Sequence, residues 1–141
     1  MSIPPLDPIA EPRHGALIDA FFDAIGRGDI AGQCAMLTPD FVLYEPAGLP
    51  YSGRYDGAEG WQAFLKALPA ALGGIRIKRI GLIAEGPDSA ILAMHLTARL
   101  RATGQPIDTD ILEAYRFRDG LIAEIRPWLW NTVQFAPVPQ G

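Results

Sequence analysis

The sequence is poor in the residues that build disulfide frameworks and metal centres. Among 141 residues there are one cysteine, Cys34, and two histidines, His14 and His95. A single cysteine excludes an intramolecular disulfide, and two isolated histidines give no zinc-binding spacing. We therefore expect Cys34 to be a small buried residue, and we expect the protein to use no metal and no cofactor.

Surplus positive charge and long apolar runs are also missing. Twelve Lys and Arg face sixteen Asp and Glu, which gives a formal net charge of −4. Binders of nucleic acids or anionic membranes need clustered surplus cations, so neither partner is expected. No apolar run reaches the ~20 residues of a membrane-spanning helix. Residues 1–12 contain four prolines and do not resemble a signal peptide. These absences predict a soluble, cytoplasmic protein.

The chain has enough apolar residues for one hydrophobic core. Hydrophobic residues make up 49% of the sequence and charged residues 20%, a composition typical of a folded globular domain. We expect one domain over residues 13–135, preceded by an N-terminal arm at 1–12 and followed by a C-terminal tail at 136–141.

Apolar residues recur at helical spacing in two segments. The first spans 17–25 and is expected to end at Gly28; a short helix capped by Asp29 follows it as far as Leu37. Another helix is expected from residue 57, where Asp56 and Glu59 form a capping-box pattern, to Pro69. The sequence thus predicts three helices.

The rest of the chain has the pattern of β-strands separated by turns. The expected strands are 41–45, about 51–55, 75–84, 90–101, 107–118 and 121–130. Helices come first and an antiparallel meander follows. This order predicts an α+β fold in which helices cover one face of a sheet.

One expected strand, 107–118, has a mostly apolar face that carries a single acid. Alternate side chains share a face of a strand. The residues of this face are Ile107, Thr109, Ile111, Glu113, Tyr115 and Phe117. Glu113 is therefore a candidate for a buried carboxyl group.

The hairpin at Asp119-Gly120 decides what lies opposite Glu113, and two registers compete. A two-residue turn places Arg126 opposite Glu113, which would make a cross-strand salt bridge. A three-residue loop with a bulge places Ile125 there and separates polar from apolar residues cleanly. We favour the second register.

Glu45 has the same character at the end of the strand 41–45. It shares a face with Phe41 and Leu43 and directly precedes Pro46. One interpretation is a solvated loop acid, the common fate of glutamate. The other is a carboxylate at the mouth of an apolar cavity, where desolvation raises its pKa and suits it to act as a base.

The opposite face of the sheet carries charged and aromatic residues. His95 falls on the mixed face of its strand, away from Met94, so a catalytic role for it is disfavoured. Trp128 and Trp130 share the outer face of the last strand with Arg126. Exposed tryptophans beside charges are typical of a subunit interface, so we expect a homodimer through this face; core filling is the alternative.

Four segments in order resemble the superfamily of SnoaL-like polyketide cyclases and ketosteroid isomerases, which have the nuclear transport factor 2-like fold. These segments are 21–29, 42–48, 53–61 and 115–122. The resemblance covers about residues 14–133. It implies a curved mixed sheet wrapped around three helices into a cone with an apolar pocket, in a protein that is usually dimeric through the outer face of the sheet.

The resemblance also implies roles for particular residues. Glu45 falls where ketosteroid isomerases carry their base, and Glu113 where they carry a protonated acid that holds an oxyanion; this isomerase is a known example of two carboxyls with different protonation in one site. Phe21 stands where the isomerase has its oxyanion tyrosine, and Asn131 about where many cyclases have an aspartate. Tyr55 or Tyr115 could supply the missing donor.

Three functions follow. The first is a cofactor-independent isomerase or cyclase in which Glu45, Glu113 and Tyr115 act on an apolar carbonyl compound. Its expected substrate-binding residues are Phe21, Tyr55, Trp61, Phe64, Met94, Ile125 and Leu129. The second is a non-catalytic ligand-binding module, and the third is a dimeric interaction module that uses Trp128 and Trp130.

Overall fold

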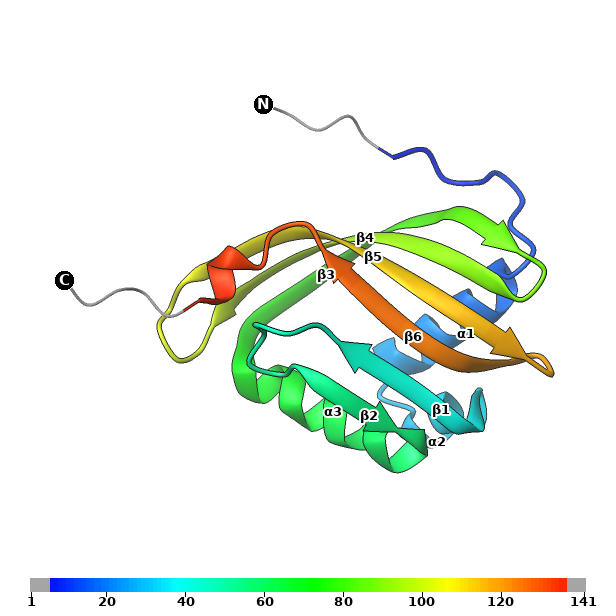
Figure 1. The fold of residues 1–141 in the computed structure, drawn as a ribbon, viewed down its shortest axis with the longest axis horizontal. Coiled ribbons are helices and arrows are strands. Elements are labelled where there is room, and N and C mark those ends of the chain that lie inside the picture. Colours follow the sequence, from blue (N-terminus) through cyan, green and yellow to red (C-terminus); the bar gives the residue numbers. More distant parts are fainter. Residues whose placement is uncertain (1–5, 137–141) are drawn as a thin grey trace.

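The structure is a computed structural model that describes residues 6–136, and in it three helices pack against one sheet (Figure 1). The helices are α1 (Gly15–Gly26), α2 (Ile30–Ala35) and α3 (Gly57–Ala71). Asp29 caps α2, since its carboxylate accepts a hydrogen bond from the Gly32 N–H at 2.9 Å. None of these helices combines the length and apolar character needed to cross a bilayer.

Six strands form one open sheet in the order β2-β1-β6-β5-β4-β3. Their bounds are β1 Leu37–Glu45, β2 Gly53–Asp56, β3 Leu72–Gly86, β4 Ser89–Leu100, β5 Pro106–Arg118 and β6 Leu121–Leu129. A 3₁₀ turn, η1, follows at Val133–Phe135. β1 runs parallel to β6 and all other neighbours are antiparallel. The predicted α+β fold with a mixed, mostly antiparallel sheet on three helices is confirmed.

Both registers considered for the β5–β6 hairpin are wrong at Glu113. The turn is the two-residue kind, with Arg118 opposite Leu121. Asp119 (φ 55°) and Gly120 (φ 74°) both have left-handed backbones, as a type I′ turn requires. A bulge at Ala123 then shifts the ladder, so Glu113 lies opposite Pro127. The hairpin therefore combines a two-residue turn with an apolar residue, Pro127, opposite Glu113.

Three local predictions need correction. α2 ends at Ala35 and not at Leu37, and β1 begins at Leu37, four residues before the expected start at residue 41. α3 continues through Pro69 to Ala71, one more half-turn than the sequence predicted. Asp56 precedes α3 without capping it, because its carboxylate accepts a hydrogen bond from Arg54 Nε at 2.8 Å instead.

The three helices are tied together by two hydrogen bonds of one buried side chain, Gln33, inside an aromatic core. Trp61 of α3 donates its indole N–H to Gln33 of α2 at 2.9 Å, and the Gln33 amide donates to the carbonyl oxygen of Ala24 in α1 at 3.3 Å. Phe21 and Phe41 pack on Trp61, with ring centroids 5.2 and 6.1 Å away. This arrangement fixes the helical layer against the inner face of the sheet.

The part of the N-terminal arm that the structure describes lies along β3. The Ile9 N–H donates to the Leu82 carbonyl oxygen at 2.7 Å, and a Cβ built on Gly81 would lie 2.7 Å from Pro8. β3 is an edge strand, and the arm covers part of that edge. Of the expected tail, residues 137–141 lie outside the described residues.

Candidate active site

Glu45 is the last residue of β1 and points to the helix-covered side of the sheet. It pairs with Gly53 of β2, and Pro46 ends the strand. Phe41 and Leu43, which share its face, are fully buried, and Glu45 itself is 9% exposed. Among residues 6–136 no group donates a hydrogen bond to its carboxylate. The solvated-loop interpretation therefore does not describe Glu45.

Glu113 lies on the inner face of β5, between Leu92 of β4 and Pro127 of β6. The Tyr115 hydroxyl, two residues along the same face, donates to Glu113 Oε1 at 2.6 Å. Glu113 is only half-buried by exposed area. Protein atoms nevertheless surround it closely enough for burial to be the main influence on its pKa.

The charge of Glu113 acts on Glu45, so the two carboxyl groups lie within electrostatic range of each other. Burial, and then the charge of Glu113, raises the pKa of Glu45 from 4.5 to about 9. Burial raises the pKa of Glu113 to about 7, and the hydrogen bond from Tyr115 opposes that rise. The pair consequently holds one proton between about pH 7 and about pH 9, and it titrates as a unit.

Three tyrosines surround the acids. Tyr115 is 1% exposed and Tyr51 is 4% exposed, while Tyr55 is partly buried and donates to the Tyr51 carbonyl oxygen at 2.8 Å. Tyr51, which lies in the loop between β1 and β2, was not predicted as a site residue from the sequence. The available signal was the apolar composition of Leu49-Pro50-Tyr51, unusual for an exposed loop.

The seven expected substrate-binding residues all join the hydrophobic core. Phe21, Trp61, Met94 and Ile125 are buried, and Tyr55, Phe64 and Leu129 pack against them partly buried. The indole N–H of Trp61 is already bonded to Gln33, so Trp61 can offer a ligand only its ring. Contact of these residues with a ligand stays a prediction.

The outer face of the sheet carries His95 and the two tryptophans, as the sequence indicated. His95 lies between two carboxylates, with Nδ1 2.7 Å from Asp110 Oδ1 and Nε2 2.6 Å from Asp108 Oδ1. Trp128 is 56% exposed and Trp130 is 75% exposed. These residues therefore take no part in the site formed by Glu45 and Glu113.

Arg126 and Asn131 have their contacts outside the candidate active site, and the Asn131 N–H donates to Thr109 Oγ1 at 3.0 Å. The guanidinium of Arg126 lies over the ring of Tyr44, 4.5 Å from its centroid. The side-chain oxygen of Asn131, just before η1, accepts a hydrogen bond from the Val133 N–H at 3.0 Å. Within residues 6–136 no cluster of three His, Cys, Asp or Glu side chains is placed to hold a metal ion.

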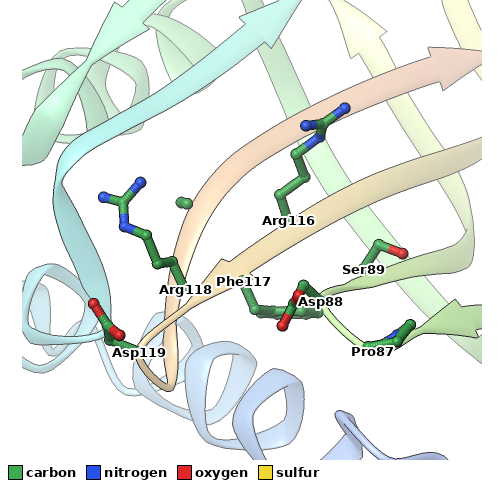
Figure 2. A pocket seen from close by; sticks show the side chains of 8 residues that line it. Pro87, Asp88, Ser89, Arg116, Phe117, Arg118 and Asp119 are labelled. Carbon is green, nitrogen blue, oxygen red and sulfur yellow. The ribbon is translucent and has the colours of Figure 1, made fainter.

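A surface groove of about 750 Å³ lies beside the β5–β6 turn, away from both acids. Its residues are Pro87, Asp88, Ser89, Arg116, Phe117, Arg118, Asp119 and Ala123. Arg116 and Arg118 extend to one side of β5 and Phe117 to the other (Figure 2). Arg118 pairs with Asp40, and acids balance the arginines around the groove. The groove is thus separate from the candidate active site.

The profile of the SnoaL-like domain family matches residues 18–125. The chain belongs to this family. A comparison with curated proteins finds no significant match.

Several solved structures share the fold at low sequence identity. An NTF2-like protein from Burkholderia xenovorans is 22% identical, with 86% of this chain and 92% of that chain covered and a TM-score of 0.75. TerC, co-crystallised with polyporic acid, is 23% identical, with 86% and 94% covered and a TM-score of 0.74. A proposed polyketide cyclase from Sinorhizobium meliloti is 18% identical, with 80% and 94% covered and a TM-score of 0.64. The similarity confirms the NTF2-like fold that the sequence resembles.

Proposed function

We propose that this SnoaL-like protein is a cytoplasmic, cofactor-independent enzyme of the isomerase or cyclase type that moves a proton on a small apolar carbonyl compound. The observation that carries the proposal is the placement of Glu45 and Glu113, two carboxyls on the inner face of the sheet among apolar residues and within electrostatic range of each other. Perturbed, mutually coupled acids are typical of proton-transfer sites. The substrate would occupy an apolar pocket beside them.

The chemistry needs one ionised and one protonated carboxyl. The ionised group removes a proton from the carbon next to the carbonyl, and the protonated group donates a hydrogen bond to the enolate oxygen. Return of the same proton to another carbon completes an isomerisation with no oxidant or reductant. A pair that holds a single proton meets this requirement.

The resemblance assigns the base to Glu45 and the donor to Glu113. The hydrogen bond from Tyr115 instead stabilises negative charge on Glu113, and burial keeps the proton on Glu45. Glu45 can therefore serve as the base only once the proton has moved to Glu113, for example when a ligand oxygen approaches Glu113. The exchanged assignment, with Glu113 as base, needs no such move. The pH profile of the exchange rate tests the pair whichever carboxyl is the base.

Proteins of the same fold support a small-molecule site. TerC was co-crystallised with polyporic acid, and a protein from Catenulispora acidiphila with a ketosteroid isomerase-like fold was solved in complex with trimethylamine. Because all these proteins are less than 25% identical to the chain, they support the kind of site and not its substrate.

The decisive experiment follows the exchange of carbon-bound protons in D₂O by NMR, with 2-tetralone, 2-indanone and cyclohexanone as probes. The protein should accelerate exchange over buffer, and Glu45→Gln and Glu113→Gln should each lower the rate about 100-fold or more. Glu59→Gln, at an exposed acid in α3, is the matched control. Wild-type rates in both site variants would remove the carboxyls from the mechanism.

A non-catalytic ligand-binding module is the alternative, and Phe21 favours it. This fully buried side chain has no hydroxyl to hold an oxyanion. Thermal stabilisation by the three ketones without any proton exchange, unchanged in Glu45→Gln, would support the binding module over the enzyme.

We also propose that the outer face of the sheet forms a homodimer interface around His95, Arg126, Trp128 and Trp130. The exposed area of the two tryptophans supports this proposal. Sedimentation should show a dimer for the wild type and a monomer for the double variant Trp128→Ala, Trp130→Ala. Ile30→Ala, an exposed apolar residue of α2, is the control. A monomeric wild type would contradict the proposal.

A further inference from the structure

The three phenols near the acids differ in what their hydroxyl groups already bind. The Tyr115 hydroxyl donates to Glu113 at 2.6 Å, and the Tyr55 hydroxyl donates to the Tyr51 carbonyl oxygen at 2.8 Å. The Tyr51 hydroxyl has no hydrogen-bond partner among residues 6–136. Tyr51 as a whole is 4% exposed, but its hydroxyl oxygen is not fully buried, so this hydroxyl is accessible to a ligand and has no protein partner among the described residues to give up.

The loop between β1 and β2 brings Tyr51 close to Glu45. The pair Glu45–Gly53 closes this loop, and Tyr51 lies two residues before Gly53. A turn holds the intervening backbone, since the Ser52 N–H donates to the Leu49 carbonyl oxygen at 3.0 Å. The position of Tyr51 relative to Glu45 is therefore set by short-range backbone contacts.

Packing fixes the ring of Tyr51 as well. Phe64 of α3 and Phe135 of η1 contact it edge to face, each with its ring centroid 6.2 Å away. The hydrogen bond from Tyr55 to the Tyr51 backbone adds a further restraint. A donor restrained before the ligand arrives loses little entropy on binding, which is the property that makes oxyanion donors effective.

Tyr51 lies within electrostatic range of both carboxyls. Burial is the main cause that raises the pKa of Tyr51 above its ordinary value, and the charges of Glu45 and Glu113 raise it further. The phenol therefore keeps its proton at every pH at which the carboxyl pair titrates. It can donate a hydrogen bond but cannot act as an acid or base there.

We propose that Tyr51 binds the ligand: its hydroxyl donates a hydrogen bond to the carbonyl oxygen of a ligand that lies between Glu45 and Glu113. This inference rests on the proposed function and adds a third polar group to it. The enolate formed when one carboxylate accepts the proton would otherwise meet a single protonated carboxyl. Tyr51 supplies a second, neutral donor, and no proton leaves it during the reaction.

The test compares a ketone with its hydrocarbon counterpart. Binding of 2-tetralone and of tetralin is measured by calorimetry for the wild type, for Tyr51→Phe, and for Tyr44→Phe as a tyrosine control on the outer face. Loss of one neutral hydrogen bond should weaken 2-tetralone binding to Tyr51→Phe about 5- to 10-fold. Tetralin should bind all three proteins equally. Unchanged ketone binding, or equal losses for both ligands, would overturn the inference.

Proton exchange on 2-tetralone separates an enolate donor from a simple ketone contact. An enolate accepts a stronger hydrogen bond than a ketone, so kcat for Tyr51→Phe should fall about 100-fold, more than its affinity falls. A fall confined to KM would contradict this. If Tyr51→Phe folds poorly, 3,5-difluorotyrosine at position 51, a stronger donor, should tighten binding of the ketone and not of tetralin.

The outcomes also distinguish this inference from the function on which it rests. If Glu45→Gln and Glu113→Gln exchange protons at the wild-type rate while Tyr51→Phe loses ketone affinity, proton transfer by the acids is wrong and Tyr51 remains a ligand-binding residue. If the acids are essential and Tyr51→Phe matches the wild type, the inference alone fails. A wild type that binds neither ligand overturns both.

Discussion

The Tyr115 hydroxyl donates a hydrogen bond of 2.6 Å to Glu113 Oε1, whereas Glu45 accepts none from the residues that the structure describes. A donated hydrogen bond stabilises a carboxylate and does not stabilise a protonated carboxyl to the same degree. The two glutamates lie on the same face of one sheet, but the ionised form of Glu113 is stabilised more than that of Glu45. This inequality lets the pair carry one negative charge and one proton at once.

The rate of proton exchange on a ketone should have a bell-shaped dependence on pH. Activity requires one carboxyl ionised and the other protonated, so the rate should rise as the pH passes about 7 and fall as it passes about 9. Rates measured with 2-tetralone between pH 5 and 11 test this. A single rise with a midpoint near 4.5, the ordinary glutamate value, would contradict the coupled pair.

Tyr115→Phe should shift only one side of that profile. The hydrogen bond from Tyr115 lowers the pKa of Glu113, so its removal should raise that pKa above about 7 and move the rising limb to higher pH. The falling limb, set mainly by Glu45, should move much less. Tyr44→Phe, on the outer face, serves as the control and should reproduce the wild-type profile.

On the outer face, His95 should titrate above its ordinary value. The Asp110 hydrogen bond is the main cause that raises its pKa, and the Asp108 bond contributes less. Histidine NMR titrations should therefore give a larger downward shift for Asp110→Asn than for Asp108→Asn. Equal downward shifts would contradict this ranking of the two acids, and no shift in either variant would mean that the carboxylates do not hold the imidazolium in solution.

The sign of the stability effect at His95 follows from the same contacts. A histidine whose pKa is raised by folding contributes stability that is fully present below its unfolded value of 6.5. The contribution disappears as the pH rises through the higher folded value. Urea unfolding of wild type and His95→Gln should therefore differ most below pH 6.5 and converge in alkaline solution.

Gly60 provides a test of the packing that supports the site. A Cβ at Gly60 would lie 2.5 Å from the Tyr55 carbonyl carbon, so Gly60→Ala must push α3 away from β2 at a cost of about 1–3 kcal/mol. At Gly26, near the end of α1, a Cβ meets nothing within 4 Å. Gly26→Ala should be neutral or stabilising by about 0.5 kcal/mol. Equal unfolding midpoints for the two variants would contradict this account of the contact.

Alternation along the strands was enough to predict which faces are buried. Glu113 and Met94 face inward and His95 outward because residues two apart must share a face, whatever the neighbouring strand. The register at Glu113 was not predictable in the same way. Both alternatives assumed a uniform ladder after the turn, and the bulge at Ala123 combines features of each.

Contacts between distant segments account for the other differences. The parallel pairing of β1 with β6 joins the two ends of the domain, and no local pattern encodes it; the resemblance alone implied a mixed sheet. Tyr51 was missed because its burial depends on Phe64 and Phe135, which come from a helix and a turn far along the chain. Proline at position 69 was treated as a stop, although the final turn of α3 tolerates it.

The central claim, that Glu45 and Glu113 share one proton inside the fold, is tested most directly by NMR titration of ¹³C-labelled glutamate carboxyls. Glu45→Gln and Glu113→Gln assign the two signals. The account predicts one titration near pH 7 and one near pH 9, each altered when the other acid is replaced. Two independent titrations near 4.5 would contradict it.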